Sequence, residues 1–209
     1  HYLLIDARTG AIAATFDGGE LTARRTAAAS ALASTYLSQP ESRRLLVVGT
    51  GRLAPKLAQA HATVRPIESV QVWGRDPGKA AEIVVMLAGL GIDATVADDL
   101  ERAVREAEII SCGTLAVEPL IRGVWLQPGA HLDLVGAFTP TMREADDDAI
   151  RRARVFVDIR ESAQAEAGEI VQAISRGVLR PQDIAGDLFD LTRDAVAGRT
   201  ARDEITLFK

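Results

Sequence analysis

The chain reads LLVVGTGRLA over residues 45–54, an apolar run followed by a glycine-rich turn. The apolar half is typical of a buried parallel strand, and residues 54–63 have the pattern of a helix. A strand, a Gly-x-Gly-x-x-Ala turn and a helix in this order form a dinucleotide-binding unit. Gly49 would allow the tight turn, Gly51 the approach of a pyrophosphate, and Ala54 close packing of the helix on the strand. The amides at the helix start would face the phosphates, so the sequence predicts a nucleotide site.

A tight turn without a ligand is the alternative for so short a pattern, and the surrounding order of elements favours the nucleotide site. Strands are expected at residues 45–48, 69–73, 92–97, 109–112, 131–135 and 154–157, and helices at 21–37, 54–63, 77–88, 99–106 and 143–152. This alternation predicts an α/β fold with a doubly wound parallel sheet of the Rossmann type.

Both ends of the chain carry β-like segments outside this alternation. Residues 3–5 and 12–16 are apolar runs on either side of a Thr-Gly turn, which predicts a hairpin. Residues 205–209 read ITLFK and stop without a turn, and the chain starts with histidine instead of methionine. We therefore expect the chain to be a piece of a longer polypeptide.

The composition is that of an ordinary globular protein and narrows the possible partners. Of 209 residues, 47% are hydrophobic and 25% are charged, with a net charge of −5. That charge gives no support for binding to nucleic acid or to an anionic membrane, and no apolar stretch is long enough to span a bilayer. A single cysteine excludes an internal disulfide and is consistent with a reducing cytoplasm. Three scattered histidines and one cysteine do not form a zinc-binding set, so no metal site is expected.

The end of the strand at 69–73 indicates which nucleotide would bind. NAD-preferring sites place an acidic residue here, where it bonds the ribose 2′-hydroxyl. This chain has Gly74 at that position, followed by Arg75, a planar donor suited to a 2′-phosphate. Asp76 and Pro77 form a helix-start pattern, so Asp76 is expected to cap the next helix. The alternative for Arg75 is a solvated loop charge; the sequence favours NADP(H) over NAD(H).

Four other residues have both a chemical and a structural interpretation. Arg52 could lie over the pyrophosphate or point to water, and the sequence does not choose between them. Thr114 follows the strand at 109–112, where ligands approach a doubly wound sheet. Cys112 has no evident activating base, so we interpret it as a buried small residue. His131 begins an apolar strand and is interpreted as structural.

Several segments, in the same order along the whole chain, resemble the ornithine cyclodeaminase/μ-crystallin family. They are LTARRTAA at 21–28, GTG at 49–51, WGRDP at 73–77, EPL at 118–120, PGAH at 128–131, VGA at 135–137, RE at 143–144 and ITLFK at 205–209. The resemblance implies a dimeric, cytoplasmic protein with a Rossmann domain and a second domain for substrate binding and dimerisation. Family members include ornithine cyclodeaminases, alanine dehydrogenases, and reductases of cyclic imino acids and ketimines.

The resemblance also implies a division of this chain. Residues 1–19 would be a hairpin fragment of the substrate and dimerisation domain, residues 20–198 the NAD(P)-binding Rossmann domain, and residues 199–209 a return segment to the second domain. A further substrate-binding arginine and lysine of the family would lie upstream of His1.

On this resemblance Arg25 corresponds to the arginine that grips a substrate α-carboxylate, and Thr26 to a contact with the cofactor phosphate. A bidentate guanidinium suits a carboxylate. The alternative is that Arg24 and Arg25 only solvate a helix face. The full set expected at the cofactor is Thr26, Gly49, Gly51, Arg52, Leu53, Gly74, Arg75, Thr114, Val135 and Gly136.

One departure from the family pattern bears on the reaction. Cyclodeaminases carry a catalytic aspartate two residues after the glycine of the VGA segment, where this chain has Phe138. Phenylalanine cannot act as an acid or a base. The leading hypothesis is therefore an NAD(P)H-dependent reductase of a small cyclic imino acid similar to 1-pyrroline-2-carboxylate. The alternatives are a cyclodeaminase-type lyase that recycles NAD, and a binding protein that holds a nucleotide or a small ligand without turnover.

Overall fold

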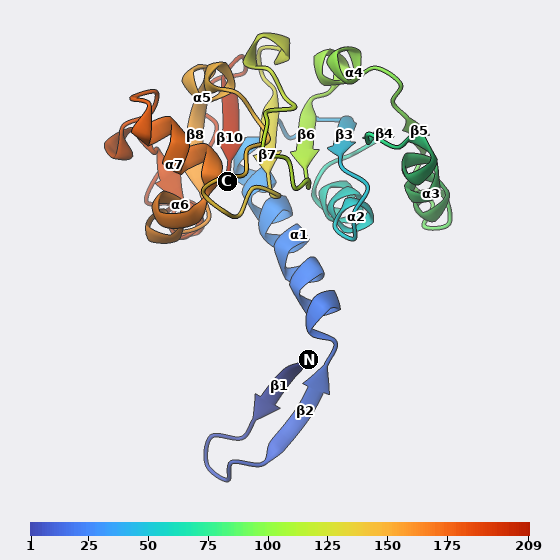
Figure 1. Ribbon diagram of the computed structural model, residues 1–209, viewed down its shortest axis with the longest axis vertical. Coiled ribbons are helices and arrows are strands. Elements are labelled where there is room, and N and C mark those ends of the chain that lie inside the picture. The colour runs from blue at the N-terminus through green and yellow to red at the C-terminus, as the bar shows by residue number, and fades with distance from the viewer.

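An eight-stranded sheet forms the centre of the computed structural model, which describes residues 1–209 (Figure 1). Its strand order is β5-β4-β3-β6-β7-β10-β8-β9, and all of its pairings are parallel. The strands are β3 (Arg44–Val48), β4 (Ser69–Trp73), β5 (Ala94–Val96), β6 (Ile109–Cys112), β7 (His131–Leu134), β8 (Ala153–Val157), β9 (Gly186–Asp187) and β10 (Ile205–Phe208). The expected Rossmann-type sheet is confirmed.

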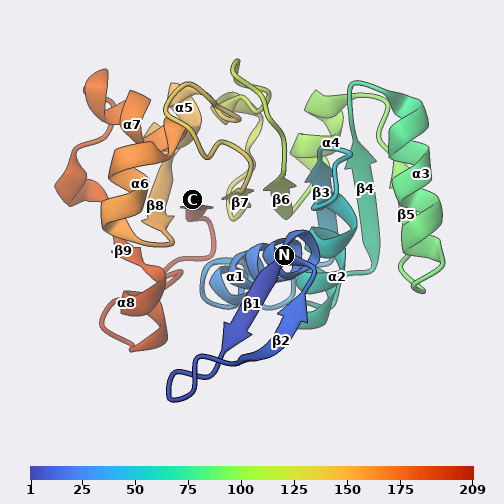
Figure 2. The ribbon, with the colours of Figure 1, turned by 60° about the horizontal axis from the view of Figure 1, so that its bottom comes forward.

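Helices cover both faces of this sheet. They are α1 (Gly18–Leu37), α2 (Ala54–Val64), α3 (Pro77–Ala88), α4 (Leu100–Glu106), α5 (Asp147–Arg152), α6 (Arg160–Glu166), α7 (Gly168–Ser175) and α8 (Leu188–Thr192). Figure 2 shows α1 and α2 side by side under the sheet, where they contact each other. None of the helices is both long enough and apolar enough to cross a bilayer.

The central strand β3 is covered by helices on both faces, which explains why its residues 45–48 are all apolar. Leu46 and Val48 pack into the core beneath α4 and α5, whereas Leu45 and Val47 pack against α2 and α3. A strand covered on both faces needs apolar side chains on both. From β3 the chain adds β4 and β5 on one side, and then returns to add β6 on the other side of β3. The order of strands therefore reverses between β3 and β6, which is where ligands bind in open α/β sheets.

The last strand occupies a place that differs from the expectation for residues 199–209. They were expected to return to a second domain, but β10 lies between β7 and β8 and pairs with both. Its side chains are all buried, and Thr206 Oγ1 donates a hydrogen bond to the Leu37 carbonyl at 2.8 Å. A short apolar run with both backbone edges paired is an interior strand, so this segment completes the Rossmann sheet.

The predicted hairpin is present as β1 (Tyr2–Ile5) and β2 (Ile12–Phe16), which pair antiparallel. Figure 1 shows it projecting away from the sheet at the start of α1. Its apolar side chains, including Leu4 and Ile12, are exposed. Asp17 caps α1 by accepting a hydrogen bond from the Glu20 amide, which ends the hairpin and starts the helix.

The helix expected at 143–152 is shorter than its charge pattern predicted. It begins only at Asp147, because the Asp146 side chain accepts the Ala149 amide and caps the helix there. Residues 143–145 instead precede the helix and are buried, which places Glu144 inside the protein next to the candidate site.

Candidate nucleotide and substrate site

A cavity of about 770 Å³ lies at the carboxyl-terminal edge of the sheet, around the ends of β3, β4 and β6. We call it the first cavity. Five residues predicted to bind the cofactor line it together: Gly49, Gly51, Gly74, Arg75 and Thr114. The cavity therefore lies at the reversal between β3 and β6, where the fold places a dinucleotide.

The glycine turn presents its backbone to this cavity. Gly49 has a φ of +120°, and a Cβ there would lie 2.6 Å from the Gly113 carbonyl oxygen, so the position requires glycine. A Cβ on Gly51 would meet nothing within 4 Å, which leaves open space above the turn. The amides of residues 50–53 donate no hydrogen bond within the protein, and they precede the N-terminus of α2. Free amides, open space and a helix N-terminus together fit a pyrophosphate.

The end of β4 combines two cations with an engaged carboxylate. Asp76 is confirmed as a helix cap, since its Oδ1 accepts the Gly78 amide at 2.9 Å and the Lys79 amide at 3.3 Å. The absence of a side chain at Gly74 is explained by packing, because a Cβ there would lie 2.5 Å from Thr50 Cγ2. Arg75 lines the cavity, and so does Lys79, which the sequence reasoning missed. Lys79 could have been predicted from its place in the first turn of the helix that follows β4.

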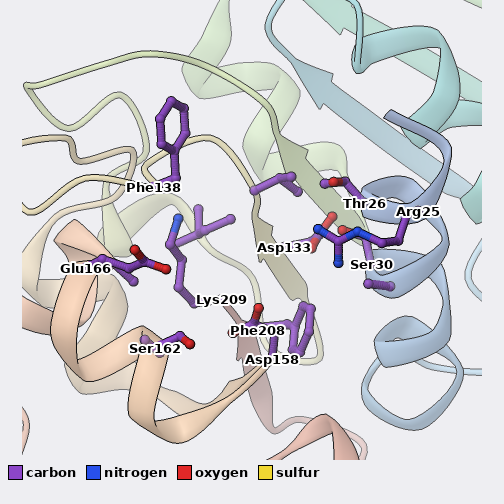
Figure 3. A pocket seen from close by; sticks show the side chains of 15 residues that line it. Arg25, Thr26, Ser30, Asp133, Phe138, Asp158, Ser162, Glu166, Phe208 and Lys209 are labelled. Atoms are coloured by element: carbon purple, nitrogen blue, oxygen red, sulfur yellow. The ribbon is translucent and has the colours of Figure 1, made fainter. Parts of the chain in front are cut away.

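A second, smaller cavity of about 150 Å³ lies farther along the same edge, at the ends of β7, β8 and β10. Figure 3 shows Arg25, Thr26 and Ser30 of α1 on one wall and Ser162 and Glu166 of α6 on the opposite wall. The Arg25 guanidinium points from α1 into the cavity (Figure 3). This exposed cation at the wall of a small, open cavity is suited to a carboxylate ligand.

The structure divides the remaining predicted residues between three places. Thr26 and Val135 line the second cavity and not the first. Arg52 and Leu53 line neither cavity, and the Arg52 guanidinium lies beside Gly19 at the start of α1. Gly136 lines neither cavity but lies against Thr114, which lines the first, and follows Val135, which lines the second.

A sequence model of the ornithine cyclodeaminase/mu-crystallin family matches residues 1–209. This chain belongs to that family. It is 42% identical over 208 residues to the Δ(1)-pyrroline-2-carboxylate reductase of Paracoccus denitrificans, covering 99% of this chain and 66% of the relative. It is 36% identical over 169 residues to the rat (Rattus norvegicus) ketimine reductase mu-crystallin, covering 81% of this chain and 53% of the relative.

Solved structures of the family have the same fold. The Δ(1)-pyrroline-2-carboxylate reductase of Thermococcus litoralis, in complex with NADH and L-proline, superposes with a TM-score of 0.95 at 33% identity. That match covers 99% of this chain and 64% of the other. An archaeal alanine dehydrogenase dimer with bound NAD gives 0.91 at 29% identity, covering 99% and 63%. The matches therefore span between 53% and 66% of the length of these relatives.

In this member of the family the loop after β7 carries a phenylalanine at the second cavity. Phe138 lines that cavity and is 59% exposed. The acidic side chains around the same cavity come from other elements, namely Asp133 of β7, Asp158 after β8 and Glu166 of α6. Residue 138 itself therefore brings no proton-transferring group to this cavity.

A buried polar layer lies behind the second cavity, between the sheet and the helices α1 and α2. Asp133 Oδ2 accepts a hydrogen bond from Ser111 Oγ at 2.6 Å and lies 3.3 Å from His61 Nε2. Burial alone would raise the pKa of Asp133, but His61 and Ser111 together hold it below its usual value. This layer could not be predicted from the sequence, because its members come from three separate elements: α2, β6 and β7.

His131 and Cys112 are buried structural residues, as the sequence indicated. Burial lowers the pKa of His131 to about 3, so the imidazole is neutral, and its Nδ1 lies 3.0 Å from Thr206 Oγ1. Burial also raises the pKa of the Cys112 thiol well above its usual value, and the nearby carboxylate of Glu144 adds to the effect. A thiol in this environment is not a nucleophile.

Proposed function

We propose that this protein is an NAD(P)H-dependent reductase of a small cyclic imino acid similar to 1-pyrroline-2-carboxylate. The observation that carries the proposal is the second cavity, which is small, contains the Arg25 guanidinium and lies beside the nucleotide-sized first cavity. The reductase names of the relatives support the same reaction class. A ring acid held by its carboxylate at Arg25 would place its C=N bond near the boundary between the cavities.

The chain's own residues would act by binding and orientation. The free amides of residues 50–53 would hold the pyrophosphate at the start of α2. Arg25 would fix the substrate carboxylate through a bidentate pair, which restricts rotation of the ring. A bound nicotinamide nucleotide supplies the hydride that reduces the imine carbon. The small size of the second cavity would limit access of water to the reacting bond.

Phe138 supports a reductase over a lyase. Deamination needs a group that removes and returns protons, and phenylalanine cannot do so. Reduction of an imine that is already protonated needs only a hydride and a well-placed carboxylate. The hydrophobic face of Phe138 would instead contact the apolar part of the ring.

We propose further that NADP(H) is preferred over NAD(H). Arg75 and Lys79 both line the first cavity at the end of β4, while Asp76 is engaged as a helix cap. Two cations and no free carboxylate at this position suit a 2′-phosphate better than a 2′-hydroxyl.

The hairpin at residues 1–19 is proposed to belong to a substrate and dimerisation domain, and the protein to be a homodimer. Its exposed apolar side chains would be covered in such an arrangement. A reduced, buried Cys112 is consistent with a cytoplasmic location, which we propose as well.

The reaction is tested by following oxidation of NADPH when 1-pyrroline-2-carboxylate is added. Parallel reactions contain ornithine, with ammonia as the readout, or nucleotide alone. A reductase gives substrate-dependent NADPH oxidation and L-proline, with no ammonia from ornithine. Ammonia release would favour the lyase, and nucleotide binding without either reaction would favour a binding protein.

A further inference from the structure

Three loops at the carboxyl-terminal edge of the sheet pack backbone against backbone. The loop after β3 contacts the loop after β6, where a Cβ on Gly49 would lie 2.6 Å from the Gly113 carbonyl oxygen. The loop after β6 contacts the loop after β7, where a Cβ on Gly136 would overlap the Thr114 backbone. Thr114 lines the first cavity and Val135 the second, so the Thr114–Gly136 contact links a loop of the first cavity to a loop of the second.

One buried carboxylate bridges this contact. Glu144 Oε1 accepts hydrogen bonds from the Thr114 amide at 2.7 Å and from Thr114 Oγ1 at 2.7 Å. Its other oxygen, Oε2, accepts the Gly136 amide at 2.7 Å. Glu144 is fully buried and lines neither cavity. Its carboxylate therefore touches both loops from behind, without direct access to a ligand.

Glu144 is itself held firmly on the protein side. Its amide donates to Glu169 Oε1 at 2.6 Å, and its carbonyl accepts the Leu120 and Ile121 amides at 2.8 and 2.9 Å. Glu169 of α7 forms an ion pair with Lys209, with 3.2 Å between Oε2 and Nζ. A fixed backbone gives the carboxylate a fixed position from which to hold the loops.

We propose that Glu144 is a positioning residue for the nucleotide. Its carboxylate holds the loops after β6 and β7 at the spacing that a dinucleotide needs where it passes from the first cavity to the second. An ionised carboxylate can accept hydrogen bonds at two oxygen atoms, whereas an amide side chain of the same shape has only one acceptor oxygen. This inference rests on the proposed function, since it requires that a dinucleotide occupies both cavities.

The groups facing Glu144 make this bridge sensitive to pH. They are Glu169 from α7, Lys209 after β10 and the neutral thiol of Cys112 on β6. Burial raises the pKa of Glu144 to about 7; the charge of Lys209 opposes this rise and that of Glu169 adds to it. Protonation puts a hydrogen on an oxygen that now accepts one, so the bridge weakens as the pH falls. Dinucleotide binding should therefore tighten as the pH rises through about 7.

The test compares NADP⁺ with 2′-phospho-ADP-ribose, which lacks the nicotinamide and reaches only the first cavity. In Glu144→Gln the amide nitrogen faces a backbone N–H, so one loop loses its acceptor. We expect NADP⁺ affinity to fall about tenfold, while affinity for 2′-phospho-ADP-ribose changes less than about threefold. The rise in NADP⁺ affinity between about pH 6 and about pH 8 should be larger in the wild type than in the variant, in which only the 2′-phosphate of the ligand, with a pKa of about 6, still titrates. Glu101→Gln, an exposed carboxylate of α4, is the matched control and should behave as wild type.

A second variant keeps the inference testable if Glu144→Gln does not fold. Thr114→Val removes one of the three donors to the carboxylate, and that hydrogen bond favours the ionised form. The midpoint of the pH dependence should therefore move to higher pH. An unmoved midpoint, or an equal loss of both ligands in Glu144→Gln, would overturn the positioning role. A wild type that binds neither ligand would instead overturn the proposed function.

Discussion

The first cavity is built from neighbouring pieces of chain, whereas the second is built from pieces that lie far apart. The glycine turn, the end of β4 and the start of α3 fall within residues 49–79, and only the loop after β6 comes from elsewhere. The second cavity takes residues from α1, from the end of β7 and the loops after β7 and β8, from α6, and from the end of β10. A local motif therefore marks the first cavity, but only the order of strands in the sheet creates the second.

The two cavities also differ in what would recognise a ligand. The first offers free backbone amides around glycines. A larger side chain in the glycine turn should therefore weaken ligand binding there more than a change of charge does. The second offers the Arg25 guanidinium and Lys209, which is 5% exposed, so a change of charge should damage it more. Substitutions in each cavity test this difference.

The largest effect is expected from Gly49→Ala. The added Cβ would meet the Gly113 carbonyl at 2.6 Å, and the residue would keep a φ of +120°, which alanine rarely adopts. We expect a loss of about 2–4 kcal/mol in the free energy of unfolding, measured by urea denaturation.

Gly51→Ala is the matched control for volume. Its Cβ meets nothing in the protein, so stability should change by less than about 1 kcal/mol while NADP⁺ affinity falls at least about tenfold. If Gly51→Ala bound NADP⁺ normally, the space above the turn would not be where the pyrophosphate lies.

The second effect in size concerns Arg25→Ala in the second cavity. Loss of a charge-assisted pair should lower kcat/KM for the imino acid about a hundredfold, with little change in the Kd of NADPH. Arg24→Ala is the control, because Arg24 is exposed and pairs with Glu20 on the same helix. An equal loss of NADPH affinity in Arg25→Ala would mean that Arg25 serves the nucleotide and not the substrate.

A smaller effect is expected from Arg75→Ala. Affinity for NADPH should fall by about one to two decades, since a charged contact to the 2′-phosphate is lost, while affinity for NADH should not change. Lys79→Ala should act in the same direction to a smaller extent. Titration of both nucleotides gives the answer, and equal affinities for NADPH and NADH in the wild type would remove the basis for this assignment.

A separate effect, on the pH dependence of stability and not on ligand binding, concerns the buried histidine at the start of β7. His131 has a folded pKa of about 3 against an ordinary 6.5. Between these values the unfolded chain binds a proton that the folded protein does not, so this residue lowers stability as the pH falls from 6.5 to 3. In His131→Asn the uptake of protons on unfolding near pH 5 should be smaller by about one. Urea denaturation at several pH values measures it, and an unchanged pH dependence would mean that His131 is not buried as a neutral group.

The sequence predicted the features that depend on local chemistry. The strand and glycine turn at 45–54, the cap at Asp76 and the hairpin could all be recognised because neighbouring residues determine them. The place of β10 could not, because a short apolar run specifies a strand but not its partners. The same holds for Glu144, whose charge pattern suggested a helix although its hydrogen bonds reach two loops after distant strands. The role expected of Arg25 came from the family resemblance, and its place in a cavity depends on α1 packing beside β7 and β10.

The most direct test of the two-cavity account is a crystal structure of the protein with NADP⁺ and L-proline, the expected product. In this crystal the pyrophosphate should lie against the amides of residues 50–53, the 2′-phosphate beside Arg75, and the proline carboxylate on the Arg25 guanidinium. The nicotinamide should lie between the two cavities, next to Thr114 and Gly136. A proline carboxylate bound away from Arg25, or a nucleotide bound outside the first cavity, would contradict it.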